Sequence, residues 1–251
     1  KTTLLNQILT NQKGYKVAVI VNDIGEVNVD AKLIADGAKV TDTSSIVPLT
    51  NGCICCTLKT DLVNNIEKLI KTGKYDYILI EASGVCEPMP IAQSLMQVSN
   101  GQLDNVIGVV DAKRLVDEFA GGDKLLNKEM EEEDIESLLV QQIEFCSTLV
   151  INKKDLVTED QFKKVRAVIN AVHPDAKVIE TDHGKVDIAD MLATNSFDFE
   201  EVYSSAGWCK KLEEAEEEDD DDDDEHEHHG DHHATDDHPS QFFQMVAEGQ
   251  C

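Results

Sequence analysis

The chain has 251 residues, 41% of them hydrophobic, which is enough to bury the core of one large domain with appendages. Its formal net charge of -28 argues against nucleic acid and anionic membranes as partners. No apolar run reaches about 18 residues, which excludes a transmembrane helix, and the start at Lys1 shows no apolar signal-peptide core.

The acidic charge is concentrated in residues 213–238, which hold 16 Asp or Glu, six of the eight His and no Lys or Arg. Taking these 16 from the 50 acidic residues leaves 34 against 22 basic ones, so the rest of the chain is only moderately acidic. The seven Cys are an odd number, and three of them lie within residues 53–56. This usage favours thiols or a metal over a disulfide framework and predicts a reducing, cytoplasmic setting.

Short β-branched apolar runs alternate along the chain with helical patterns. The runs lack polar alternation, which suits strands buried on both faces of a parallel sheet, and they cover residues 17–21, 77–80, 106–110, 148–151 and 178–179. Apolar residues spaced three and four apart predict helices between them, as at Leu62, Ile66 and Leu69 or at Phe162, Val165 and Ile169. The βαβα order predicts an α/β fold with helices on both faces of a mostly parallel sheet.

The first residues, Lys1-Thr2-Thr3, precede an amphipathic stretch and match the end of a phosphate-binding loop, GxxxxGK[ST]. In such a loop Lys1 contacts the β and γ phosphates, the Thr2 hydroxyl binds Mg²⁺, and Thr3 lies beside them in the nucleotide site. The phosphate-cradling glycines of the loop would stand before Lys1. A Lys-Thr-Thr sequence is also an ordinary helix start, so a capping role stays open.

Three thiols, those of Cys53, Cys55 and Cys56, share one short loop just ahead of a predicted helix. Thiolates bind soft or borderline cations, and a helix N-terminus favours the thiolate by lowering its pKa. At most three ligands come from this loop, and an incomplete shell suits a transferable metal ion better than a structural one. A redox loop or a set of small buried residues is the alternative.

The apolar run 77–80 ends in Glu81-Ala-Ser-Gly84. A carboxylate at the carboxyl end of a strand is well placed to position Mg²⁺ or its water, and Gly84 lets the backbone approach the γ-phosphate. Glu81 is therefore a candidate for the nucleotide site. The alternative is an acid that merely ends a strand at the surface.

The run 148–151 leads into Asn152-Lys153-Lys154-Asp155, an N-K-x-D sequence. The Asp155 carboxylate can accept hydrogen bonds from both the ring N–H and the exocyclic amine of guanine, a pairing that adenine does not offer. Asn152 would brace the neighbouring loop, and Lys153 would lie along the base. A polar turn with Asp155 as a helix cap is the competing interpretation.

Several other segments carry weaker predictions. Residues 124–136 are predicted to form a surface loop that runs into a helix through Gln142. Residues 213–238 cannot bury enough apolar area to fold, so we expect disorder without a ligand. Their imidazoles suit divalent metals, although a solvated spacer is the alternative; the candidates are His226, His228, His229, His232 and His233, with His238 nearby. His173, His183, Cys86, Cys146 and Cys209 are expected to be ordinary surface, packing or isolated residues.

Four segments together resemble the CobW-like family of P-loop GTPases, which includes zinc and cobalt chaperones and metallocentre activators. They are Asn51-Gly-Cys-Ile-Cys-Cys56, Glu81-Ala-Ser-Gly-Val-Cys-Glu-Pro88, Val21-Asn-Asp-Ile-Gly-Glu26 and Asn152-Lys-Lys-Asp155. The resemblance covers roughly Lys1 to Phe199 and implies a P-loop NTPase fold.

The resemblance also implies roles for individual residues. Cys53, Cys55 and Cys56 match the family's metal ligands, Lys1 and Thr2 its phosphate and Mg²⁺ residues, and Asn152 and Asp155 its base-reading pair. Residues 21–30 match a first switch segment, in which Asn22, Asp23 and Glu26 are candidates for sensing Mg²⁺ and phosphate. Glu81 and Gly84 match the second switch segment. Because the cysteine loop lies between the two, the resemblance implies that nucleotide binding changes the grip on the metal.

The sequence therefore predicts a GTPase, with Lys1, Thr2 and Glu81 as catalytic residues, that uses GTP, Mg²⁺ and Zn²⁺ or Co²⁺. It would deliver the metal to a client metalloprotein, and a GTP-dependent homodimer is left open. The alternatives are a non-catalytic metal buffer that uses the cysteine loop and the His-rich tail, and an assembly factor with redox-sensing cysteines. The predicted domains are a GTP-binding domain (1–203), an acidic His-rich disordered linker (204–238) and the start of a truncated C-terminal domain (239–251).

Overall fold

The computed structural model describes residues 2–10, 14–22, 46–49, 59–82, 84, 86–127, 130, 134–205 and 241–248. Only the backbone is described for residues 21–22, 46–49, 59–61, 203–205 and 241–248. The predictions for Lys1, Glu26, the cysteine loop and the histidine tail lie outside the described residues.

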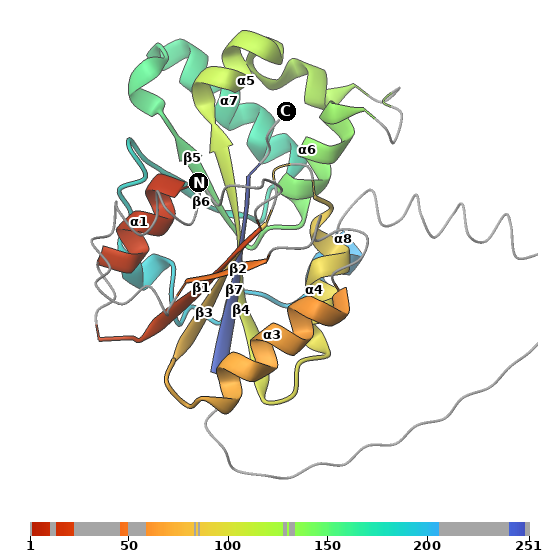
Figure 1. The fold of residues 1–251 in the computed structure, drawn as a ribbon. Coiled ribbons are helices and arrows are strands. Elements are labelled where there is room, and N and C mark those ends of the chain that lie inside the picture. The colour runs from red at the N-terminus through yellow and green to blue at the C-terminus, as the bar shows by residue number, and fades with distance from the viewer. Residues whose placement is uncertain are drawn as a thin grey trace, which may run out of the picture.

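In the described part of the chain, strands form a single seven-stranded sheet in the order β2-β1-β3-β7-β4-β5-β6, and every neighbouring pair is parallel (Figure 1). The strands are β1 (Val17–Asn22), β2 (Ile46–Leu49), β3 (Tyr77–Glu81), β4 (Gly101–Asp111), β5 (Thr148–Asn152), β6 (Lys177–Glu180) and β7 (Gln241–Glu248). All five predicted runs fall inside strands. The predicted α/β fold with a mostly parallel sheet is confirmed.

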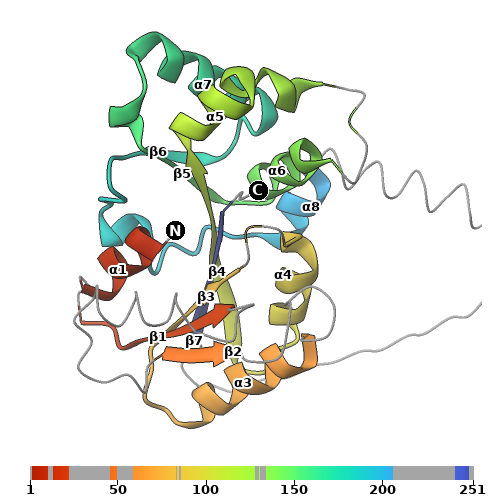
Figure 2. The same ribbon diagram turned by 45° about the horizontal axis from the view of Figure 1, so that its top comes forward.

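Helices cover both faces of this sheet (Figures 1 and 2). One face packs against α1 (Thr2–Thr10) and the short 3-10 turn η4 (Ile188–Asp190). The other face packs against η2 and the remaining α-helices of the described chain, which are α3 (Lys59–Lys71), α4 (Pro88–Met96), α5 (Ala112–Glu118), η2 (Ala120–Leu126), α6 (Ile135–Glu144), α7 (Glu159–Val172) and α8 (Phe199–Ser205). None of the described helices is long and apolar enough to cross a membrane.

The two-sided burial explains the apolar runs of the sequence. Successive side chains of a strand point to opposite faces of the sheet. In β3, Leu79 joins the cluster beneath α1, whereas Ile78 and Ile80 join the cluster beneath α3 and α4. Every residue of β3 is buried, so no position on this strand favours a polar side chain for contact with water.

Two strands were not predicted. β2 contains Pro48, whose missing N–H weakens a strand prediction, and it lies at the edge of the sheet, where proline is tolerated. β7 comes from the stretch 239–251, which we expected to begin a truncated C-terminal domain. Its residues Gln241–Glu248 pair with β3 on one side and β4 on the other, and this domain boundary stays a prediction. Its apolar composition suits a strand buried on both faces. The other domain boundaries stay predictions.

The path of the chain through the sheet sets the location of a ligand site. It runs outward from β1 to β2, returns to β3, and then crosses to β4, β5 and β6 on the other side. The connection that leaves β1 and the connection that leaves β3 therefore run to opposite sides, so the progression reverses between these two neighbouring strands. In open α/β sheets, ligands bind outside the carboxyl ends of the strands at such a reversal. Those ends carry Glu81, Asp111 and Asn152.

Candidate nucleotide-binding site at the carboxyl edge of the sheet

Asn152, the last residue of β5, braces the loop that follows β6. Its side-chain Oδ1 accepts a hydrogen bond from the backbone N–H of Gly184 at 3.0 Å. The same loop is tied to the end of β5 by a backbone hydrogen bond from Thr181 to Ile151. The bracing role predicted for Asn152 agrees with this geometry, while its role in nucleotide binding stays a prediction.

Asp155 is exposed, and its backbone is fixed by the same loop. The Asp155 N–H donates to Asp182 Oδ1 at 2.9 Å, which sets the position of the residue without using its own carboxylate. Asp155 lines an open pocket together with Thr158, Phe162 and Asp182. A carboxylate that is fixed in place and faces open space can accept two parallel hydrogen bonds from a planar base.

Lys153 adopts a left-handed backbone conformation with φ 61°, and its ammonium pairs with Asp111 at the end of β4. Asp111 also caps α5, since its Oδ1 accepts a hydrogen bond from the Arg114 N–H at 3.1 Å. The carboxyl ends of β4 and β5 are thus joined by side chains. Where we predicted that Lys153 lies along a base, the structure pairs its head group with Asp111.

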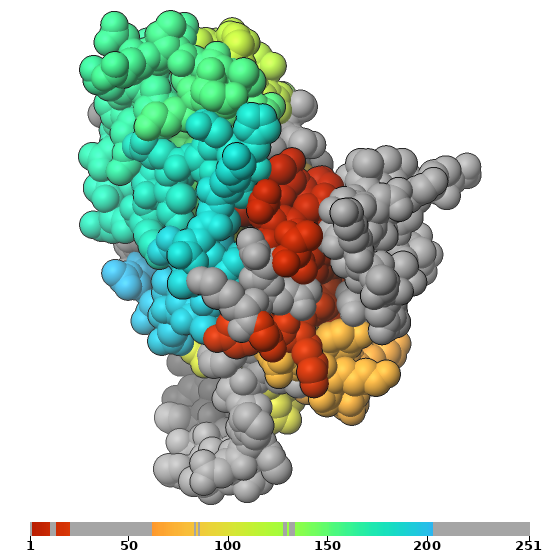
Figure 3. All heavy atoms as spheres, turned by 90° about the vertical axis from the view of Figure 1, so that its left-hand side faces the viewer, coloured from red at the N-terminus to blue at the C-terminus, as the bar shows by residue number. Residues whose placement is uncertain are grey.

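Gly184 lies in the loop after β6, which Asn152 braces, and this loop lies beside the first helix. Its φ is +64°, a conformation that favours glycine, and a Cβ built there would lie 3.2 Å from the backbone N of Leu4. Figure 3 shows α1, in red, against the cyan surface that includes this loop. The start of α1, with Thr2 and Thr3, therefore lies beside the loop that Asn152 braces. A helix N-terminus at this edge favours anions such as phosphate.

Glu81 and Gly84 lie at and just beyond the end of β3, and both are buried. Glu81 is 1% exposed, so it does not end its strand at the surface, which was the alternative considered. Burial of an acid is costly unless it has partners, and it is typical of a functional position. Thr2 and Glu81 contribute hydroxyl and carboxylate oxygens at this edge, the donor type that Mg²⁺ requires.

The segment predicted to be the second switch is held by a residue that the sequence did not single out as functional. Gln142 of α6 donates from Nε2 to the carbonyl oxygens of Gly84 at 2.9 Å and of Cys86 at 3.0 Å. The segment after Glu81 is therefore fastened to a helix more than 50 residues away in the sequence.

The predicted metal ligands belong to segments outside the described residues. Cys53, Cys55, Cys56, Glu26 and the tail histidines all lie outside them. Within the residues that are described, no group of three or more His, Cys, Asp or Glu side chains could hold a metal ion.

Two other cysteines behave as packing residues. Neither Cys86 nor Cys146 forms a disulfide within the described part of the chain, and both are fully buried. Burial raises the pKa of the Cys146 thiol to about 12, which keeps it protonated near neutral pH. A protonated buried thiol is a poor metal ligand, so Cys146 contributes to the core. His173 contacts the backbone carbonyl of Cys146 through Nε2 at 2.9 Å.

Sequence reasoning missed Asp111, Gln142, Asp182 and Gly184. Asp111 had a detectable signal, since it is an acid that ends a strand and directly precedes a helix. Asp182 and Gly184 follow β6 in the sequence Thr-Asp-His-Gly, a typical turn composition. Gln142 had no local signal, because its two acceptors are distant in the sequence.

Comparison with known proteins assigns this arrangement to a family. Residues 1–180 match the family described as CobW/HypB/UreG, nucleotide-binding domain. The chain is 37% identical to the zinc-regulated GTPase metalloprotein activator 1 of Dictyostelium discoideum, over 84% of this chain and 49% of that protein. It is 32% identical to the protein of the same name from Schizosaccharomyces pombe, over 78% of this chain and 46% of that protein.

A bacterial relative matches as well. The chain is 32% identical to the zinc chaperone YjiA of Escherichia coli, over 80% of this chain and 59% of that protein. The chain thus spans about half the length of the curated relatives it matches. With the family match covering residues 1–180, the chain belongs to the CobW/HypB/UreG family, as a nucleotide-binding domain of the P-loop type.

Proposed function

We propose that this chain is the nucleotide-binding domain of a GTP-hydrolysing metallochaperone, which carries Zn²⁺ or Co²⁺ on Cys53, Cys55 and Cys56 and passes it to a client metalloprotein. The observation that carries the nucleotide part is the link from Asn152 through Gly184 to the start of α1. It joins the proposed base-reading loop to the proposed phosphate-binding helix. Relatives named as zinc-regulated GTPases and zinc chaperones support the metal part.

The proposed hydrolysis uses groups at the carboxyl edge of the sheet. The Lys1 ammonium and the N-terminus of α1 hold the phosphates, while Asp155 selects guanine. Mg²⁺, when bound, would supply positive charge that offsets the negative charge developing during phosphoryl transfer. The Thr2 hydroxyl and the Glu81 carboxylate hold that ion and its water, and water is the nucleophile.

Chain connectivity supports a coupling between the metal and the nucleotide. β2 ends at Leu49 and α3 begins at Lys59, so the segment with the three cysteines starts from the same sheet edge as the nucleotide groups. Three thiolates leave a fourth coordination position for water or for a ligand of the client, which suits transfer. A nucleotide-dependent shift of either switch segment would then strengthen or weaken the grip on the metal.

The test measures GTP hydrolysis by a chain in which a complete glycine-rich loop precedes Lys1. We expect the rate to respond to added Zn²⁺ or Co²⁺, and the double variant Cys55→Ala, Cys56→Ala to lose that response while still hydrolysing GTP. Cys209→Ala is the matched control and keeps the response. A metal response that survives in the double variant contradicts the coupling.

The metal-buffer alternative rests on the six histidines among the acids of residues 213–238. Deleting these residues separates the two functions. A metallochaperone keeps tight binding of one metal ion at the cysteine loop after the deletion. If the deletion removes nearly all metal binding and leaves no tight site, the buffer function is favoured instead.

A further inference from the structure

The Gln142 side chain bridges two carbonyl groups of the connection between β3 and α4. Its Nε2 donates to Gly84 O at 2.9 Å and to Cys86 O at 3.0 Å. Both hydrogens of one amide are used, and both acceptors are backbone atoms. Because both contacts are to carbonyl oxygens, the orientation of the amide is unambiguous. The connection cannot move away from α6 unless two buried hydrogen bonds break together.

The burial of Gln142 makes its two hydrogen bonds costly to break. The residue is 4% exposed, and Gly84 and Cys86 are buried as well. A buried carbonyl that loses its donor destabilises the protein, since water does not replace the bond. Among the described residues, Gln142 Oε1 has no hydrogen-bond partner although it is buried. The observed arrangement therefore leaves an acceptor unsatisfied, and an arrangement that brings an N–H to it would recover that cost.

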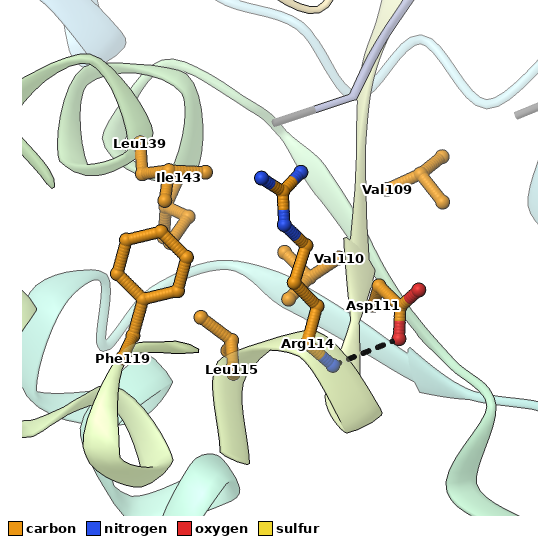
Figure 4. A pocket seen from close by; sticks show the side chains of 8 residues that line it. All are labelled: Val109, Val110, Asp111, Arg114, Leu115, Phe119, Leu139 and Ile143. Atoms are coloured by element: carbon orange, nitrogen blue, oxygen red, sulfur yellow. Dashed lines mark hydrogen bonds between the residues drawn. The ribbon is translucent and has the colours of Figure 1, made fainter. Parts of the chain in front are cut away.

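α6 also lines a pocket near the end of β4. Leu139 and Ile143 line a small pocket with Asp111 and Arg114, and Figure 4 shows the Arg114 side chain extending between the two walls of this pocket. Asp111 in turn pairs with Lys153. After α6 the chain enters β5, which ends at Asn152. A single helix thus bonds to the segment after Glu81 and lines a pocket together with Asp111, whose side chain pairs with Lys153.

We propose that Gln142 is a positioning residue that holds the Gly84 backbone in place for the nucleotide, and thereby sets the preference of this domain for GTP over GDP. The γ-phosphate is the only group that distinguishes the two nucleotides, and Gly84 is the proposed backbone contact to it. The hydrogen bond to the Gly84 carbonyl restrains the same peptide segment. This inference rests on the proposed GTPase function.

The test compares Gln142→Met, which keeps the length of the side chain but removes both donors, with Gln141→Met on the same helix. Affinities for GDP and for a non-hydrolysable GTP analogue are measured by calorimetry on the chain with its complete phosphate loop. Because two hydrogen bonds change, we expect the ratio of the two affinities to shift about tenfold in Gln142→Met and to stay at the parent value in Gln141→Met.

A merely structural role would lower the melting temperature and leave the affinity ratio unchanged. A ratio within about threefold of the parent value therefore overturns the inference, and a larger shift supports it. If Gln142→Met does not fold, Gln142→Asn, which keeps an amide but shortens its reach, is judged by the same ratio. A parent protein that binds neither nucleotide removes the proposed function itself, which distinguishes that failure from a failure of the positioning role alone.

Discussion

At the scale of single residues, side chains hold backbone groups of the predicted base-reading loop (residues 152–155) and of the loop after β6. Asn152 accepts from Gly184, and Asp182 accepts from Asp155. Neither contact uses the Asp155 carboxylate. The loop is thereby fixed before any ligand binds, which reduces the ordering cost of binding.

Replacing Asp155 with Asn tests the reading of guanine. Hydrogen bonds to a charged group are worth about 1.5–3 kcal/mol, so we expect GTP affinity to fall about 10- to 100-fold. An amide can instead donate to the C2 carbonyl of xanthine, so affinity for xanthosine triphosphate should rise. Calorimetry with both nucleotides measures this. Asp160→Asn, on the exposed side of α7, is the control, and equal GTP affinity in both variants would refute the assignment.

Replacing Gly184 with Ala tests the contact between the loop and α1. An alanine forced into the left-handed region costs about 1–2 kcal/mol, and Gly73→Ala with φ +59° and no atom within 4 Å measures that cost alone. At Gly184 the new Cβ also meets the backbone of Leu4 at 3.2 Å. We expect denaturant unfolding to show an added loss of about 1 kcal/mol for Gly184→Ala, together with weaker nucleotide binding. Equal losses in the two variants would mean that the contact has no energetic role.

At the scale of elements, a substitution in β7 gives the most direct test of the sheet. Its backbone pairs with β3 on one side and β4 on the other, and Met245 lies opposite Ile80 and Val106. A proline cannot donate in such a ladder and is excluded from central strands. The sheet geometry therefore makes a direct prediction for one substitution in this strand.

We expect Met245→Pro to destabilise the domain by about 3 kcal/mol or more in urea unfolding, because it removes a ladder hydrogen bond from a central strand. Ala234→Pro, in the acidic segment, is the matched control and should have little effect. Unfolding curves that coincide for the two variants would show that the sheet does not depend on β7.

The same scale explains what the sequence could predict. Runs such as Tyr77–Glu81 were recognisable because a strand buried on both faces needs apolar residues throughout. The bracing role of Asn152 was predicted from its place in the N-K-x-D motif, although its partner Gly184, 32 positions away, could not be predicted. The contacts of Gln142 were not, since they join residues 56 and 58 positions apart. β2 was not predicted, because a proline such as Pro48 is tolerated in a strand at the edge of a sheet, and the edge position is a property of the folded sheet.

At the scale of the whole molecule, the acidic His-rich segment and the three clustered cysteines lie far apart along the chain. Residues 213–238 carry 16 of the 50 acidic residues and six of the eight histidines. Such a segment raises the local concentration of divalent cations without needing a fixed structure. In the proposed function it collects metal, while the three cysteines hold the ion that is transferred. The prediction of a cytoplasmic protein follows from the cysteine usage of the sequence and awaits localisation of the protein.

The central claim is that the guanine nucleotide controls the grip of the cysteine loop on its metal. The most direct measurement is the Zn²⁺ affinity of the protein with its complete phosphate loop, determined by competition with a chromophoric chelator in the empty, GDP-bound and GTP-analogue-bound forms. Because couplings between linked sites are typically 5- to 150-fold, we predict that the GTP-analogue and GDP forms differ by about tenfold or more. Equal affinity in all three forms would contradict the account.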